Sequence, residues 1–155
     1  MRHDDIPDDL KRLAFDFFYW FSRFEFALKE ACCLKSADEG AKAEVGWDLF
    51  IEKHWNAYQL NAAGHALIDA KPQRQIVSAG GLDFRDVGFN AGVSDLERVV
   101  RLANTVRNNL FHGGKHGSDY WDEPDRMRDL LTVTIKALDD LAAQAGLQGN
   151  YERYY

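Results

Sequence analysis

The stretch that decides the fold lies near the start of the chain and reads Phe15-Asp16-Phe17-Phe18-Tyr19-Trp20-Phe21-Ser22-Arg23-Phe24-Glu25-Phe26. Eight of these twelve residues are aromatic. Across the longer segment from Pro7 to Leu34, apolar residues recur at alternating spacings of four and three, which predicts one long amphipathic helix. Its apolar seam consists of Leu10, Ala14, Phe17, Phe21, Phe24, Leu28 and Ala31.

Further aromatic residues surround most of this helix outside the seam. They are Phe15, Phe18, Tyr19, Trp20 and Phe26. A helix that is apolar nearly all round needs more than one partner surface. We therefore expect one face to meet the core and another to meet a second copy of the chain, which predicts a homodimer. The alternative is that all of this surface packs within one chain.

The middle of the chain is harder to assign. A second helix is predicted from Ala41 to Asn61, and its candidates for inward positions are Val45, Leu49, Trp55, Tyr58 and Ala62. From Gly64 to Gly92, one proline and five glycines predict an irregular insert. Within it, Gly80-Gly81 separates Gln75-Ile76-Val77 from Leu82-Asp83-Phe84, which is consistent with a small hairpin.

Two more helices have clearer boundaries. Ser94 and Glu97 form a capping box, and Gly113-Gly114 are expected to end that helix after His112. Its buried stripe is Val99, Val100, Ala103, Val106 and Leu110. A last helix should begin at residues 122–124 and end at Gly146, with Met127, Leu130, Leu131, Thr134, Leu138, Leu141 and Ala145 facing inward.

These elements predict an all-α fold, a bundle of four to five helices with a long first helix and an irregular insert before the helix that ends at His112. A single domain should cover residues 1–147, and residues 148–155 are predicted to be a frayed tail. With 155 residues, the chain is large enough to bury about two thirds of its unfolded surface without disulfides. Cys32 and Cys33 are expected to be packing residues inside the first helix.

Composition indicates a soluble protein. The apolar runs are broken by charged residues, so no membrane span is expected, and the first residues lack the pattern of an export signal. We therefore expect a cytoplasmic protein. The net charge of -6 is unusual for a nucleic-acid binder, but residues 98–118 carry four Lys or Arg and no acid. This basic segment favours either a phosphate backbone or the acidic faces of its own neighbours.

The basic segment contains the run Arg107-Asn108-Asn109-Leu110-Phe111-His112-Gly113-Gly114. RNA carries its own nucleophile, the 2′-hydroxyl, so cleavage needs a group that moves protons and a group that stabilises the charged transition state. His112 suits the first role, and the fork-shaped guanidinium of Arg107 suits the second. Asn108 could orient the imidazole or donate to the phosphate.

On an ideal helix, Arg107 and His112 point about 140° apart. The two side chains can therefore act on one atom in three ways. The long side chain of arginine can bridge the gap, the last helical turn at His112 can loosen, or a second copy of the chain can supply one of the two residues. Asn104, Asn108 and His112 share one polar ridge. The alternative for His112 is a charge that complements the end of the helix dipole, and Arg107 could instead pair with Glu25.

The Arg107-to-His112 run resembles the R-x-x-x-x-H motif of the HEPN superfamily (higher eukaryotes and prokaryotes nucleotide-binding domains). The aromatic helix from Tyr19 to Lys29 is similar to the first helix of bacterial members. This resemblance implies a helical, metal-independent endoribonuclease that leaves 2′,3′-cyclic phosphates. It also implies a dimer whose two motif helices line one cleft, and a role as a toxin or defence effector. Where some HEPN toxins carry a tyrosine modified by the antitoxin, this chain has Gly114, so only an antitoxin of another kind fits.

Several other residues are candidates for the same site. Arg101, Asn104, Lys115 and His116 are predicted to bind RNA, and Glu25 is a candidate support for Arg107 or His112, although it could equally neutralise Arg23. His112 and His116 have the spacing of a metal pair, but the intervening glycines argue against a metal site, and no cofactor is expected. The alternative function is a HEPN module without activity that binds RNA, a nucleotide or a protein partner.

Overall fold

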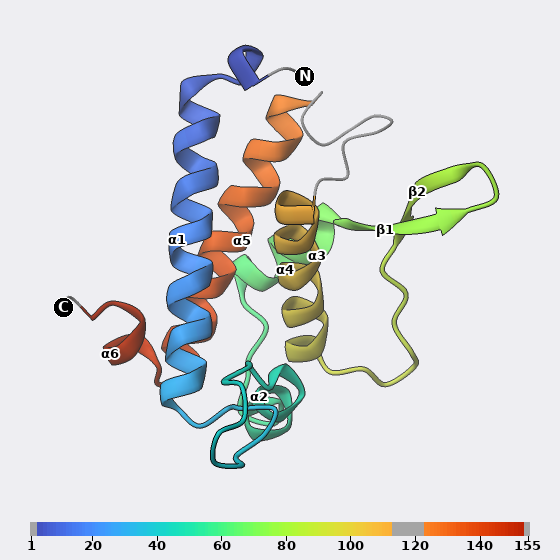
Figure 1. The fold of residues 1–155 in the computed structure, drawn as a ribbon. Helices are drawn as coiled ribbons and strands as arrows, with labels where there is room; N and C mark the ends of the chain where they lie inside the picture. The colour runs from blue at the N-terminus through green and yellow to red at the C-terminus, as the bar shows by residue number, and fades with distance from the viewer. Residues whose placement is uncertain (1–2, 113–122, 154–155) are drawn as a thin grey trace.

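Helices dominate the fold in the computed structural model, which describes residues 3–112 and 123–153. The described residues form six α-helices. Figure 1 shows a hairpin that projects from these helices. After a 3-10 turn at His3–Asp5, the elements are α1 (Asp8–Glu30), α2 (Trp47–His54), α3 (Ala62–Ala70), β1 (Gln73–Ser78), β2 (Gly81–Asp86), α4 (Asp95–His112), α5 (Pro124–Gln144) and α6 (Gln148–Tyr151). The prediction of a mainly helical protein with a long first helix is confirmed.

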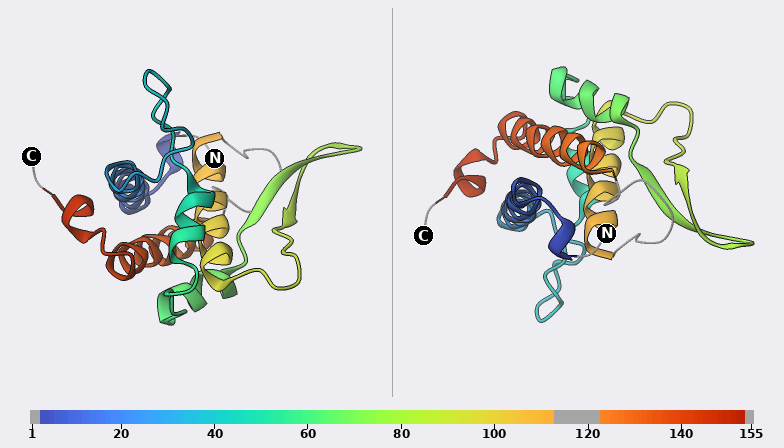
Figure 2. Two further views of the ribbon diagram at one scale, coloured as in Figure 1. Left: turned by 90° about the horizontal axis from the view of Figure 1, so that it is seen from below. Right: turned by 90° about the horizontal axis from the view of Figure 1, so that it is seen from above.

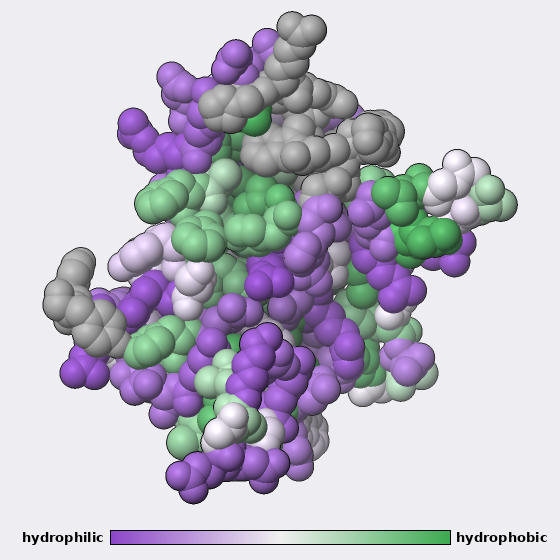
Figure 3. All heavy atoms as spheres, viewed as in Figure 1, coloured by the Kyte–Doolittle hydropathy of each residue, from purple (hydrophilic) through white to green (hydrophobic). Residues whose placement is uncertain are grey.

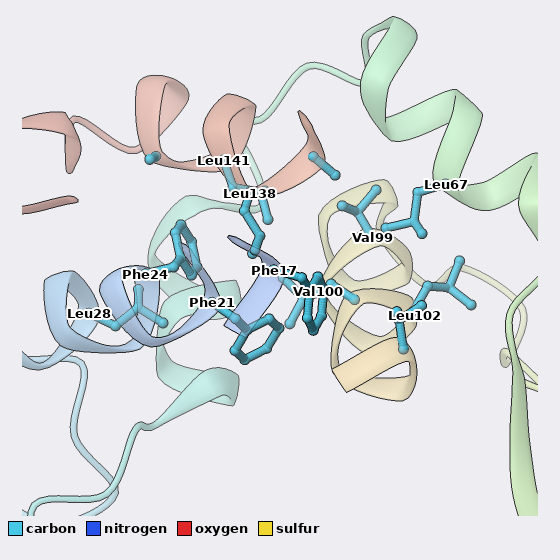
Figure 4. Packing of buried hydrophobic residues seen from close by; sticks show 14 of the residues in the cluster. Phe17, Phe21, Phe24, Leu28, Leu67, Val99, Val100, Leu102, Leu138 and Leu141 are labelled. Atoms are coloured by element: carbon cyan, nitrogen blue, oxygen red, sulfur yellow. The ribbon is translucent and has the colours of Figure 1, made fainter. Parts of the chain in front are cut away.

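The core lies between the three longest helices. In Figure 2, α1, α4 and α5 surround a common interior, and α3 packs against α4 and α5. The seam predicted for α1 is confirmed at Leu10, Phe17, Phe21, Phe24 and Leu28, which are all at most 2% exposed. Ala14 is only half-buried, and Ala31 is half-buried just after the end of the helix. Figure 4 shows the phenylalanines of this seam directed towards side chains of α4 and α5. This contact fixes the helix that carries the candidate site.

The first helix ends earlier than predicted. It stops at Glu30, since Cys32 adopts a left-handed backbone conformation with φ +58° and donates its N–H to the carbonyl of Lys29 at 3.0 Å. Cys33 then donates to the carbonyl of Leu28 at 2.9 Å. The expectation that both cysteines pack inside a helix is therefore wrong. Cys33 is buried, whereas Cys32 is exposed.

The predicted second helix, from Ala41 to Asn61, is also wrong in extent. Val45 forms an antiparallel bridge with Leu34, so the chain is extended there, and α2 begins only at Trp47. Gly46 is needed at this junction, because a Cβ there would lie 2.8 Å from the backbone of Leu34. Of the inward candidates, Val45 is buried but precedes the helix, Leu49 and Tyr58 are half-buried, and Trp55 and Ala62 are exposed.

The segment assigned to an irregular insert contains a helix and the predicted hairpin. Asn61 caps α3 by accepting the backbone N–H groups of Ala63 and Gly64 at 3.0 and 3.2 Å. After α3, β1 and β2 pair in antiparallel register, with Gln75 opposite Phe84 and Val77 opposite Leu82. The hairpin prediction is confirmed. The prediction of an irregular segment is wrong at residues 62–70, which form α3.

The last long helix matches its prediction, whereas the predicted stop of α4 at Gly113-Gly114 lies outside the described residues. Pro124 opens α5, and Met127, Leu130, Leu131, Thr134, Leu138 and Leu141 are buried along it. The tail is not frayed throughout, since residues 148–151 form α6 and Tyr151 is 2% exposed. Arg23 of α1 holds this short helix by donating to the carbonyl of Tyr151 at 3.0 Å, and the phenol of Tyr151 donates to Asp139 at 2.6 Å.

Candidate functional site

The candidate site is built on α4. Ser94 starts this helix by accepting the backbone N–H of Glu97 at 3.1 Å, which is half of the predicted capping box. The carboxylate of Glu97 accepts from Arg101 at 2.7 Å, one turn along the helix. The predicted stripe of α4 is correct, because Val99, Val100, Ala103 and Val106 are at most 1% exposed and Leu110 is half-buried. This apolar face fixes the direction of the polar face opposite.

Arg107 is held by aromatic rings. Its guanidinium carbon lies 5.9 Å from the ring centre of Phe21 on α1 and 5.5 Å from that of Phe111 on α4. Such contacts orient a guanidinium without neutralising its charge. The same group donates to the amide oxygen of Asn108 at 3.1 Å. Arg107 and Asn108 are therefore brought together, with the positive charge still available to a ligand.

His112 is the last residue of α4. Its side chain is exposed and forms no hydrogen bond or ion pair with any residue that the structure describes. No hydrogen bond joins His112 to Arg107. This agrees with the angle of about 140° between the two side chains on an ideal helix. An exposed imidazole at a helix end is accessible to a substrate or to a second copy of the chain.

A groove of about 360 Å³ runs along α4 beside the polar ridge. Its walls come from α2, α4, β1 and the segment after β2, and they consist of Trp47, Asp48, Ile51, Arg74, Val87, Val100, Arg101, Asn104, Thr105 and Asn108. Three of the predicted residues, Arg101, Asn104 and Asn108, therefore share one concave surface. Asn104 uses its amide nitrogen to donate to the carbonyl of Val100 at 3.0 Å, so its amide oxygen remains available in the groove.

Other predicted residues are not joined to this surface. Glu25 is half-buried on α1 and makes no hydrogen bond or ion pair with a described residue, so it pairs with neither Arg107 nor Arg23. The partners of Arg23 include the carbonyls of α6 instead. Lys115 and His116 lie outside the described residues.

Sequence reasoning missed two residues that shape this region. Arg74 of β1 lines the groove, and Asn109 of α4 is 7% exposed and donates to the carbonyl of Gln73 at 2.6 Å. The burial of Asn109 had a partial signal, because it directly precedes the apolar Leu110 and lies off the polar ridge. No sequence signal indicated that Arg74 lines the groove, because its position depends on where the hairpin packs.

An exposed aromatic patch lies next to Arg107. It consists of Phe15, Phe18 and Phe111, which are 65%, 47% and 45% exposed. The rings of Phe18 and Phe111 are 5.6 Å apart, so α1 and α4 contribute to one surface. Figure 3 shows hydrophobic residues exposed over the N-terminal half of α1. Phe111 belongs to this patch and also contacts the guanidinium of Arg107. His112 is the next residue in the sequence after Phe111.

No three His, Cys, Asp or Glu side chains gather in residues 3–112 and 123–153 so that they could hold a metal ion. Within the same residues, no helix combines the length and hydropathy needed to cross a bilayer.

No family model, curated protein or solved structure matches this chain.

Proposed function

We propose that this chain is a metal-independent endoribonuclease of the HEPN type. Arg107 stabilises the charge that develops on the phosphate, His112 transfers protons, and Asn108 orients the imidazole or donates to the phosphate. The nucleophile is the 2′-hydroxyl of the RNA, so the products carry a 2′,3′-cyclic phosphate and a 5′-hydroxyl. Arg101, Asn104, Lys115 and His116 are assigned to RNA binding, and Glu25 to a supporting position.

The observation that carries this proposal is the accessibility of the two charged groups. Arg107 is oriented by two aromatic rings and one amide, and no carboxylate pairs with it among the described residues. His112 is exposed at the end of the same helix. No described residue neutralises either charge, so both groups remain available for a ligand.

The site is proposed to form between two copies of the chain. No hydrogen bond joins Arg107 to His112 within one copy, and the aromatic patch of Phe15, Phe18 and Phe111 adjoins both. Large exposed aromatic side chains favour burial against a partner surface. A dimer that buries this patch places the α4 helices of both copies near one another, so Arg107 of one copy can act with His112 of the other.

The test is incubation of the purified protein with tRNA and mRNA in EDTA, followed by analysis of the product ends. Cleavage that leaves 2′,3′-cyclic phosphate ends is expected. The matched variant His112→Ala should lose cleavage while keeping its unfolding free energy, because the side chain is exposed. Cleavage that persists in this variant would assign the activity to a contaminant or to other residues and would contradict the proposal.

The lack of a hydrogen bond between Arg107 and His112 within one copy favours one alternative function. In that case the chain is a HEPN module without activity that binds RNA, a nucleotide or a protein partner through the same surface. It predicts no cleavage by the wild-type protein and retention of RNA or nucleotide at low salt. The His112→Ala variant then has no cleavage to lose, and its affinity for RNA remains measurable.

A toxin or defence role belongs to the same proposal. It implies a cytoplasmic protein that acts on cellular RNA and is controlled by an antitoxin protein. Expression of the wild-type chain in a bacterial host should slow growth, and the His112→Ala variant should not. Equal growth with both proteins would leave the nuclease assignment in place but remove the toxin role.

A further inference from the structure

We propose that the β1–β2 hairpin is an arm that holds the backbone of the RNA strand, with Arg74 and Arg85 binding its phosphates. This inference rests on the proposed RNA-directed function and extends it to residues outside the motif helix. Figures 1 and 2 show the hairpin projecting away from the helices beside α4. Four observations support the assignment.

The first observation is a pair of like charges on adjacent strands. Arg74 lies directly opposite Arg85 in the register, so both side chains are on one face of the hairpin. Like charges in this arrangement destabilise a hairpin by themselves. Both arginines are exposed, and neither forms a hydrogen bond or ion pair with a described residue. The arrangement therefore costs stability in the free protein and favours an anionic ligand.

The second observation concerns the carboxylates of the hairpin. Asp83 is the acidic residue that shares a face with the two arginines, and it accepts the backbone N–H of Phe84 at 2.8 Å. Asp86 lies on the opposite face and accepts from the side chain of Gln73 at 2.8 Å. The arginine face therefore carries a net positive charge, although Asp83 reduces it.

The third observation is that Arg74 joins the hairpin to the candidate site. Its side chain lines the groove with Asn104 and Asn108 of α4 and with Trp47 of α2. The charges along this groove are Arg74, Arg101 and Asp48, and Arg101 is already paired with Glu97. Arg74 is therefore the groove cation with no partner among the described residues.

The fourth observation is that the base of the arm is fixed to α4. Asn109 holds the carbonyl of Gln73, the residue before Arg74, and Phe84, Val87 and Phe89 pack against the core. The distance between the hairpin and the motif helix is thereby set by buried contacts. A phosphate bound at Arg74 is consequently held at a defined position relative to α4.

Together these features favour a nucleic-acid strand over an acidic protein. Guanidinium groups bind phosphate oxygens in a bidentate manner, and the groove adds amides that can hydrogen-bond bases or the 2′-hydroxyl. Trp47 of α2 adds an aromatic residue to the lining of the groove. An acidic protein partner would need only the two exposed arginines and would leave the polar groove unused.

The experiment uses the full chain with His112→Ala, so that bound RNA is not cleaved. Binding of a fluorescent single-stranded RNA is measured by anisotropy at several salt concentrations. Adding R74Q and R85Q should weaken binding about tenfold or more and reduce the log–log salt slope by about 1.4, the value expected for two lost phosphate contacts. The matched control adds K29Q and K136Q, two cations on α1 and α5, and should change neither quantity.

Two further variants and one competitor make the outcomes distinct. R74K with R85K keeps the charges and should restore the salt slope while recovering only part of the affinity. Unchanged RNA binding by the R74Q/R85Q variant would overturn this inference and leave the nuclease proposal intact. Failure of the His112→Ala parent to bind any RNA would overturn both. Binding of a poly-glutamate peptide in place of RNA would reassign the arm to an acidic protein.

Discussion

At the scale of single residues, the surroundings of Arg107 orient its guanidinium but leave its charge unneutralised. Its guanidinium lies over Phe21 and Phe111, and Asn108 accepts one of its N–H groups. The two rings restrict where the charge can point without removing it. The residue is therefore suited to hold a phosphate in one orientation, which a flexible surface arginine does less well.

We expect Arg107→Lys to lower the cleavage rate about a hundredfold or more, because lysine cannot donate two parallel hydrogen bonds to a phosphate. Single-turnover cleavage of a defined RNA measures this effect. The unfolding free energy serves as the control and should fall by no more than about 1 kcal/mol, the usual contribution of an exposed contact between a cation and a ring. A lysine variant with wild-type cleavage would show that only the charge at position 107 matters.

Tyr58 gives a prediction about pH. Burial, followed by the charges of Asp140 and Asp95, raises the pKa of its phenol to about 12, and its hydroxyl has no hydrogen-bond partner among the described residues. The unfolded chain releases this proton near pH 10, before the folded chain does. The contribution of Tyr58 to stability is therefore complete below about pH 10 and is lost as the pH rises towards 12.

The Tyr58→Phe variant isolates this effect, because Tyr151 also has a raised pKa and remains present in both proteins. Its unfolding free energy should equal or exceed that of the wild type at about pH 8, where an unpaired buried hydroxyl is removed. Urea unfolding should show a smaller decrease for the variant when the pH is raised to about 11. If the unfolding free energies of the variant and the wild type fell equally with pH, the phenol of Tyr58 would not contribute to the pH dependence of stability.

At the scale of elements, the sequence predicts long helices better than short ones. Over 23 residues in α1 and 21 in α5, the apolar spacing repeats often enough to define a buried face. The helices α2 and α3 have only 8 and 9 residues, and their limits depend on a bridge between Leu34 and Val45 and on a cap at Asn61. Such contacts link distant residues, so local spacing does not contain them.

The candidate site also combines residues that local sequence reveals with residues that only contacts between distant segments bring together. Arg107, Asn108 and His112 are recognisable because they occur together in one helix. Arg74 enters the groove only because the hairpin packs beside α4. Asn109 has its structural role only because the carbonyl of Gln73 accepts a hydrogen bond from its amide. The candidate residues that lie on one element can be named from the sequence, whereas those that join two elements cannot.

Asn109 provides the prediction for the hairpin as an element. In Asn109→Ala, the carbonyl of Gln73 loses its donor, and the unfolding free energy should fall by about 1–2 kcal/mol. Amide hydrogen exchange should accelerate in β1 and β2 more than in α5, because the anchor of the hairpin is lost. The matched control is Asn108→Ala, which removes an exposed amide from the same turn of α4. Equal exchange changes in both variants would indicate that Asn109 does not hold the hairpin.

At the scale of the whole molecule, the helices place the aromatic patch and the motif on one side. The core between α1, α4 and α5 requires Phe17, Phe21 and Phe24 to point inward, which leaves Phe15 and Phe18 on the outer surface of α1. Phe18 meets Phe111 of α4 there. Folding of one copy thus creates an apolar surface beside Arg107 and His112, and a second copy can cover it.

Mixing two inactive variants tests this arrangement. If each active site takes Arg107 from one copy and His112 from the other, a mixed dimer of Arg107→Ala and His112→Ala chains contains one intact site. Refolding the two variants together should then restore about a quarter of the wild-type cleavage, since half of randomly formed dimers are mixed and each has one of two sites. Sites formed within one copy would give no recovery, because every site would carry one defect. Phe18→Asp in both chains is the control; it places a charge in the patch and should abolish both dimerisation, measured by light scattering, and the recovery of cleavage.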